Sequence, residues 1–305
     1  MNTKPRDGKG TDGKVRYSQG TGATLQVLTG TDSMKMPDPE YRALQAVNYS
    51  SLKKIADSPL HYWHEVLNPE REKKEPTPAM VLGSAIHCLC LEGLETFAKQ
   101  YIRAGKFDRR TKEGKANYEA YLEAKGDATE LSWELWDQTH AVAAAVLKSP
   151  MAQALIEGAN GHSEEVVQWF DKETGMLCKC KADRIQTIDH ETYVVDLKTT
   201  RDASPQSFAR DMANLRYHWQ AAFYSDGVAA SGDWGPVKGF IFIAVEKEPP
   251  YPVAIYNVPE STLQHGRDQY RAALHKLKEC LEADYWPGYD DKIRDLELPR
   301  WALAS

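Results

Sequence analysis

KADRIQTIDHETYVVDLK, residues 181–198, carries the strongest indication of how this chain folds. The stretch predicts the end of one strand near Ile185 and a further strand over residues 193–198, apolar until its polar end. Because side chains alternate along a strand, Asp196 and Lys198 share one face while Leu197 points to the core. If the neighbouring strand holds Asp183 beside them, two carboxylates and one ammonium meet at a strand end.

This arrangement of charged groups suits a hard divalent cation. Mg²⁺ and Mn²⁺ prefer oxygen ligands, keep several waters and bind through few carboxylates. Such an ion would polarise a phosphoryl oxygen and lower the pKa of a bound water. Lys198 would hold or activate that water, or neutralise charge building on phosphorus. An Asp-x-Lys at a strand end is common and is usually a solvated ion pair, so this pattern alone is a weak signal.

The segments around this stretch alternate between strand and helix patterns. Further strands are predicted over residues 164–170, 176–185, 239–245 and 253–258, and helices over residues 203–229 and 261–283. The earlier part of the chain is helical, with helices predicted after Asn48, over residues 78–89 and over residues 132–156. The order predicts an α/β (α+β) fold, in which helices flank a central mixed β-sheet and a helical part precedes it.

The chain of 305 residues is long enough to bury a core. Residues 1–38 are rich in Gly, Thr, Lys and Asp, which predicts a flexible tail, and residues 39–305 are predicted to form one domain. A charged n-region followed by an apolar h-region is absent from the start, and the apolar run over residues 79–91 is too short for a bilayer. We therefore expect a cytoplasmic protein without a membrane segment.

Charge and cysteine content exclude some classes of protein. The net charge of −6 argues against a protein that coats nucleic acid, although a nucleic-acid enzyme needs only a local basic groove. The five cysteines form two Cys-x-Cys pairs without CxxC spacing, which fits neither a disulfide framework nor a zinc site. Cys178 and Cys180 would share a strand face as small buried hydrophobes.

Two helical patterns strengthen the interpretation of the strand end. Gly83-x-x-x-His87 lies on an apolar helix, where Gly83 would permit close backbone approach one turn before the imidazole. A lone His on such a helix is more often a satisfied core residue than a metal ligand. Tyr217, Gln220 and Tyr224 share a helix face. On spacing alone, that stripe is the edge of an amphipathic helix.

The ordered combination of these motifs resembles the RecE-like (exonuclease VIII-like) nucleases, in the RecB-like branch of the PD-(D/E)XK superfamily. The resemblance covers the chain from about Val47 to its C-terminus. Each motif is loose, but the ordered set is fairly specific. The stretches that carry it, besides Gly83-x-x-x-His87, Asp183, Asp196-Leu197-Lys198 and Gln220-x-x-x-Tyr224, are Tyr49-Ser50-Ser51-Leu52, Ser58-Pro59, Thr174-Gly175, Trp286-Pro287-Gly288-Tyr289 and Leu298-Pro299-Arg300-Trp301.

The resemblance implies a restriction-endonuclease-like core and roles for individual residues. The metal ions would be Mg²⁺, or alternatively Mn²⁺, and would be held by His87, Asp183, Asp196 and the main-chain carbonyl of Leu197. Lys198 would act in catalysis. Gln220 and Tyr224 match a motif that supports the site or touches DNA. A further acidic residue would be Glu165, or alternatively Glu164.

The resemblance also implies an activity and partners. It predicts a 5′-to-3′ exonuclease, similar to phage exonucleases, that degrades linear double-stranded DNA and leaves 3′ single strands for a RecT-like annealing protein in recombination. A ring-like homo-oligomer is expected. The second acid is Asp196 rather than the commoner Glu, which shortens its reach to a metal. A cysteine cluster for an iron–sulfur centre and the spacing of a phosphate-binding P-loop are both absent from the sequence.

Candidate DNA contacts are basic residues near hydroxyls and aromatic rings. A helix N-terminus with Ser51, Lys53 and Lys54 would attract a terminal phosphate. Tyr217, on the helix face that it shares with Gln220 and Tyr224, is a further candidate DNA contact. For any one of these residues, solvated surface charge is an equally good interpretation. The largest basic group lies between the predicted helices and comprises Arg109, Arg110, Lys112 and Lys115.

Two other functions remain open on the sequence. A structure-specific or single-strand endonuclease would use the same chemistry and would also cut circles. A binding scaffold that has lost catalysis would have no reason to keep Asp183, Asp196 and Lys198 together.

Overall fold

The computed structural model describes residues 36, 38–72 and 75–298. The tail predicted over residues 1–38 therefore lies almost wholly outside the described residues. Pro299-Arg300-Trp301 lies outside them as well. The grouping of residues 39–305 into one domain remains a prediction.

A five-stranded sheet forms the centre of the structure. Its order is β3-β4-β5-β6-β7, and only the β5–β6 pair is parallel. A parallel pair needs a crossover, which the helices between β5 and β6 supply. The predicted central mixed β-sheet flanked by helices is confirmed. The strands are β3 (Gly161–Phe170), β4 (Leu177–Ile188), β5 (Glu191–Thr200), β6 (Val237–Glu246) and β7 (Val253–Val258).

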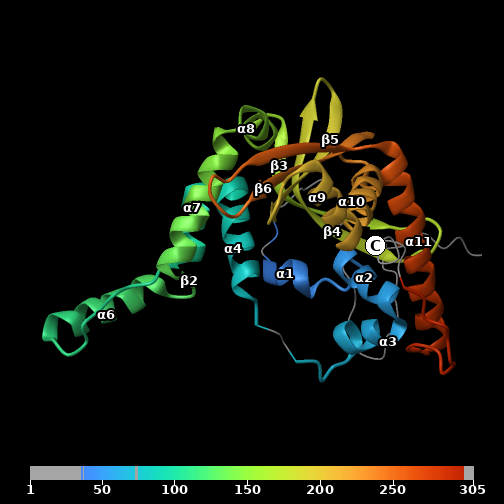
Figure 1. Ribbon diagram of the computed structural model, residues 1–305, viewed down its shortest axis with the longest axis horizontal. Helices are drawn as coiled ribbons and strands as arrows, with labels where there is room; N and C mark the ends of the chain where they lie inside the picture. The colour runs from blue at the N-terminus through green and yellow to red at the C-terminus, as the bar shows by residue number, and fades with distance from the viewer. Residues whose placement is uncertain (1–35, 37, 73–74, 299–305) are drawn as a thin grey trace, which may run out of the picture.

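Helices cover both faces of this sheet (Figure 1). One face packs on α10 (Tyr217–Ser231), which α11 (Glu260–Ala283) backs, and its core includes Phe240 and Phe242. The other face packs on α4 (Pro78–His87), α7 (Trp133–Lys148) and α8 (Pro150–Glu157), around Val195 and Leu197. The remaining α-helices among the described residues are α1 (Asp38–Ala43), α2 (Tyr49–Asp57), α3 (Pro59–Tyr62), α5 (Gly93–Gln100), α6 (Lys112–Lys125) and α9 (Pro205–Asn214), and the π-helical turn η1 (Trp63–Leu67) follows α3.

Two helices that the sequence predicted as continuous are each broken. Residues 203–229 form α9 and α10, because Arg216 adopts a left-handed backbone with φ 60° between them. Residues 132–156 form α7 and α8, because Pro150 lacks the N–H that a continuous helix needs. In contrast, Asn48 caps α2 as predicted, with its side chain accepting the N–H of Ser51 at 2.8 Å.

The apolar helix is longer than predicted. After α4 it passes through a π-helical turn (Cys88–Glu92) into α5, and the run Pro78–Gln100 is long and apolar enough to cross a bilayer by length and composition alone. Leu82, Ala85 and Ile86 of this run are nevertheless buried inside the protein. The run is thus placed as a core helix, and its last α4 residue, His87, reaches the site described below.

An arm leaves the body beside α7. The short strands β1 (Tyr101–Arg103) and β2 (Thr129–Leu131) pair in parallel at its base, and residues 104–128 between them form a loop and α6. Figure 1 shows α6 projecting away from the sheet and its helices. Gly114 is the only buried residue of α6.

Candidate active site

Asp196 and Lys198 lie together on the sheet face that α10 covers. Asp196 is 1% exposed, and its Oδ2 contacts the Lys198 ammonium. Leu197 between them points to the opposite face and joins the cluster that contains Ile86 of α4. Strand alternation therefore separates a charged pair from an apolar anchor that fixes β5 against the helices.

Asp183 reaches the same place through a break in the neighbouring ladder. The β3–β4 pairing skips Glu164 and Asp183, and Glu164 has a left-handed backbone with φ 57°. The freed Asp183 side chain turns to β5, where its Oδ2 accepts the Leu197 N–H at 2.8 Å. An irregular backbone position of this kind aims a side chain that a regular strand would place elsewhere.

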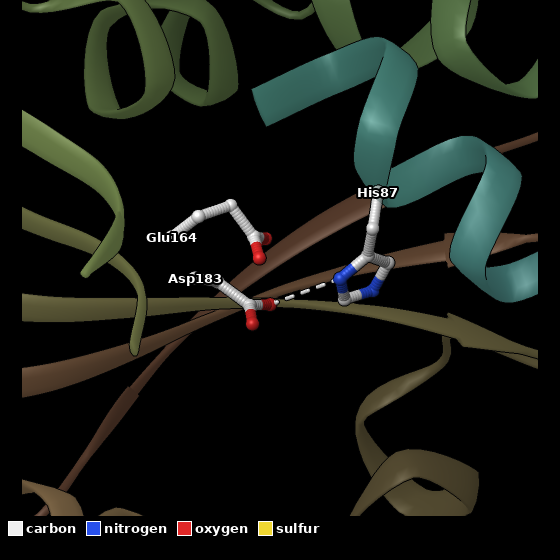
Figure 2. Close-up of side chains that lie close together, drawn as sticks. All are labelled: His87, Glu164 and Asp183. Carbon is white, nitrogen blue, oxygen red and sulfur yellow. Dashed lines mark ion pairs between the residues drawn. The ribbon is translucent and has the colours of Figure 1, made fainter. Parts of the chain in front are cut away.

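His87 completes the group from the helical side. Its Nδ1 lies 3.4 Å from Asp183 Oδ2. Figure 2 shows His87 descending from α4 toward Asp183, with the Glu164 carboxylate beside them. The three residues each offer one donor atom, and these atoms all lie within 4.8 Å of one another. One imidazole nitrogen and two carboxylate oxygens at this spacing could hold a divalent cation.

The charge states of these groups fit metal binding. Burial lowers the pKa of His87, and Lys198 adds repulsion, so the imidazole favours its neutral, ligating form. Burial raises the pKa of Asp183 well above its ordinary value, and Asp196 adds to this. Burial alone would lower the pKa of Lys198, but the Asp196 and Asp183 carboxylates outweigh it and the net shift is upward. The site thus combines clustered acids, whose mutual repulsion raises the pKa of Asp183, with a stable ammonium.

Residues of α10 support this centre. The Gln220 amide donates to Asp196 Oδ1 at 2.6 Å, and its own Oε1 is buried without a hydrogen-bond partner among the described residues. The Lys198 ammonium lies 5.0 Å from the centroid of the Tyr217 ring. Tyr224, one turn beyond Gln220, is half-buried in the core, and burial raises its pKa well above the ordinary value. Tyr224 therefore presents a neutral hydroxyl.

The glutamate that the structure brings to Asp183 is Glu164 and not the preferred Glu165. Glu165 is 3% exposed and pairs opposite Ala182 in the regular ladder. Glu164 instead turns toward the centre because of its left-handed backbone, and Lys181 holds its carboxylate at 2.6 Å. The same ammonium contacts Asp38 of α1 at 2.7 Å. Alternation alone could not have separated the two glutamates, since the sequence gives no sign of the irregular φ.

These positions predict different effects for two neighbouring substitutions. Glu164→Gln is expected to weaken the binding of a divalent cation by about tenfold or more, because it removes one group of the metal site. Glu165→Gln serves as the matched control and should leave the dissociation constant within about twofold of the wild-type value. The measurement is calorimetric titration with Mg²⁺ or Mn²⁺, with thermal unfolding of both variants. A larger effect at Glu165 would contradict the assignment.

The centre opens into a cleft of about 680 Å³. His87, Glu164 and Asp183 line it, together with residues of α1. Gly83 and Ser84 form part of the wall. Among the described residues, the close backbone approach expected at Gly83 is not found: a Cβ there would meet Thr199 Oγ1, at an ordinary 3.8 Å.

The predicted phosphate contacts of α2 have other partners in the structure. The Ser51 hydroxyl belongs to the helix cap, donating to the Asn48 carbonyl at 2.8 Å, and Lys54 pairs with Glu65 at 2.9 Å. The Lys53 ammonium lies over the Tyr49 ring, 4.6 Å from its centroid. Burial lowers the pKa of Lys53, and the ammonium of Lys198 lowers it further.

Arg216 is a further cation here that the sequence did not single out. Its Nη1 donates to the Lys53 carbonyl and to Asp57, both at 2.9 Å. A sign of its role was available, since it directly precedes the aromatic stripe of α10. The other predicted contacts lie in the arm that projects away from the sheet (Figure 1), and are Arg109, Arg110, Lys112 and Lys115.

Comparisons with known proteins agree with this architecture. A family described as "PDDEXK-like domain of unknown function (DUF3799)" matches residues 48–298. A crystal structure named "Putative exonuclease" from Eubacterium rectale is similar, with a TM-score of 0.56 and 17% identity over 89% of this chain and 99% of that chain. A second, named SSO0001, has a TM-score of only 0.26 at 14% identity, over 65% of this chain and 88% of that one. No curated protein matches the chain.

Proposed function

Since the chain belongs to this PDDEXK-like family, we propose that it is a Mg²⁺-dependent deoxyribonuclease that degrades linear double-stranded DNA from its ends. One observation carries the proposal. Asp183 and the Asp196–Lys198 pair come together from the neighbouring strands β4 and β5, and His87 and Glu164 gather at Asp183. A structural ion pair would need only one acid beside Lys198. Here a second buried acid and an imidazole are added, and the two carboxylates repel each other. A bound cation would relieve that repulsion.

Each residue has a task in this proposal. His87, Glu164, Asp183, Asp196 and the Leu197 carbonyl would hold the metal, which when bound supplies Lewis-acid polarisation of a phosphoryl oxygen. Mn²⁺ prefers the same oxygen ligands as Mg²⁺ and could occupy the same site. The raised pKa keeps Lys198 an ammonium, so it donates hydrogen bonds and neutralises charge on the phosphate instead of accepting a proton.

Gln220 acts as a positioning residue in this proposal. Its amide holds one oxygen of Asp196 in place, while the other oxygen contacts Lys198. The buried Gln220 Oε1 can accept a hydrogen bond from a bound water or substrate. Tyr217 would pack beside the Lys198 ammonium, and Tyr224 would support α10 from the core.

The finer parts of the proposal rest on the resemblance to RecE-like nucleases. They are 5′-to-3′ polarity, 3′ single strands as product, transfer of these to a RecT-like annealing protein, a ring-like homo-oligomer and a cytoplasmic location. The fold is compatible with them but also suits an endonuclease or an inactive scaffold.

Digestion of matched substrates tests the function directly. With Mg²⁺, the protein is expected to release nucleotides from linear duplex and to leave covalently closed circles intact, because a circle has no end to enter the site. End-labelled and internally labelled strands report the polarity. Cleavage of circles would favour the endonuclease, and absence of any metal-dependent cleavage would favour the scaffold.

A further inference from the structure

The arm, residues 104–128, separates its charges along its length. The part nearer its start, residues 106–115, has five basic and two acidic residues, a net charge of +3. The part that leads back to the body, residues 116–130, has one basic and four acidic residues, a net charge of −3. A chain with an overall charge of −6 therefore concentrates positive charge in one short projecting segment.

Contacts along the arm show which part is the tip. Tyr121 donates to Glu130 at 2.5 Å, which fixes this end of α6 beside β2 at the base. Phe107 packs on Tyr121 with ring centroids 5.1 Å apart, so the outgoing loop runs against α6. Arg109 lies nearly one helical turn further out, 4.7 Å from the Tyr118 ring. The residues that join loop to helix, 109–115, therefore form the far end, and they are the basic ones.

The tip is built to keep its shape in solvent. Thr111 caps α6 by accepting the Gly114 N–H at 2.9 Å. A Cβ at Gly114 would lie 2.0 Å from the Asp108 carbonyl oxygen, so loop and helix are in close contact. The Arg109 guanidinium rests on an aromatic ring, which reduces the freedom it loses on binding. The cations are thus presented from a folded element.

The chemistry of the tip favours a polyanion over a protein partner. Among described residues, the arm exposes one large apolar side chain, Leu122, and this lies in the acidic half. A protein interface needs apolar anchors at its centre. Phosphates need only cations and hydrogen-bond donors. Arg109, Lys112 and Lys115 supply these, together with Arg110, whose guanidinium pairs with Asp108 at 2.9 Å.

We propose that this arm is a second DNA-binding element, whose basic tip contacts phosphates of the duplex outside the cleft in which cleavage occurs. The inference rests on the proposed nuclease function for the identity of the polyanion. Because the arm is separate from the Asp183–Lys198 centre, it contributes to holding DNA and not to the chemical step. Contacts of this kind carry no sequence information.

The test is a fourfold variant, Arg109→Gln, Arg110→Gln, Lys112→Gln and Lys115→Gln, bound to a labelled blunt duplex with Ca²⁺ in place of Mg²⁺. Each lost phosphate contact lowers the slope of log affinity against log salt by about 0.9. We expect the slope to fall by about 2 to 4 and the affinity to fall about tenfold or more. With Mg²⁺ and subsaturating duplex, the cleavage rate should fall in step with the loss of affinity, since the tip acts by holding DNA.

The matched control removes four surface cations that pair with glutamates elsewhere, through Lys99→Gln, Lys238→Gln, Lys276→Gln and Lys278→Gln. An unchanged slope in the arm variant, or an equal loss in the control, would overturn the proposal. If the wild type binds duplex through the arm yet cuts nothing, the nuclease function fails while the arm stands. If the wild type cuts linear duplex but the arm variant and the control variant bind it equally, the nuclease function stands and the arm proposal fails.

Discussion

Lys198→Met is expected to reduce DNA cleavage by about 10²- to 10³-fold while duplex binding stays within severalfold of the wild type. Methionine keeps the length and apolar stem of lysine but removes the ammonium that contacts Asp196 and faces Tyr217. The charge on the attacked phosphate then has no neutralising partner from β5. Single-turnover cleavage of end-labelled linear duplex, with saturating Mg²⁺, measures the effect.

Controls are needed because the variant leaves a buried acid unpaired. Breaking a buried ion pair costs about 3–5 kcal/mol, so thermal unfolding must show that the variant is folded. Lys198→Arg keeps the positive charge and should retain the fold, with partial activity. Lys238→Met removes an exposed ammonium and should change nothing. Full activity in folded Lys198→Met protein would refute the catalytic role.

Asp183→Asn is expected to abolish both metal binding and cleavage. The asparagine oxygen can still accept the Leu197 N–H, so the β4–β5 contact survives, but the negative charge beside His87 and Glu164 is lost. A metal present at 100 times its dissociation constant stabilises a protein by about 2.7 kcal/mol. Mg²⁺ should therefore raise the unfolding temperature of the wild type and leave that of the variant unchanged. Calorimetric titration with Ca²⁺ or Mg²⁺ gives a second readout.

The same residue predicts a pH dependence of stability. The pKa of Asp183 is raised in the folded, metal-free protein, so the native state binds a proton more tightly than the unfolded chain. The stability this group contributes is present below its ordinary pKa and is lost as pH rises through the raised value. Metal-free wild type should thus lose stability on going from acid to neutral pH relative to Asp183→Asn. If the stability of the wild type and of Asp183→Asn changed equally with pH, Asp183 would not lie among groups that raise its pKa.

Much of the fold could be predicted because its signals are local. The period of two in residues 193–198 places Asp196 and Lys198 on one face and Leu197 on the other, whatever surrounds them. The cap at Asn48 and the burial of Cys178 and Cys180 likewise follow from short-range patterns. The succession of strands and helices indicated a mixed sheet for the same reason.

The breaks in elements were harder to predict. Arg216 in a left-handed conformation is uncommon for a residue with a Cβ, and nothing in its neighbourhood of sequence announces it. Pro150 was visible, but a proline can start a helix as readily as end one, and here it starts α8. The arm could not be foreseen, because its basic residues look the same on a body surface as on a projection.

The residue types of the candidate centre and their shared face on β5 were thus fixed by the sequence alone. Only the tertiary structure decided that Asp183 leaves its own ladder to reach β5, that His87 arrives from α4, and that Glu164 rather than Glu165 joins them. The physical reason is that alternation and capping act over a few residues. The approach of α4 to a break between β3 and β4 depends instead on how whole elements pack.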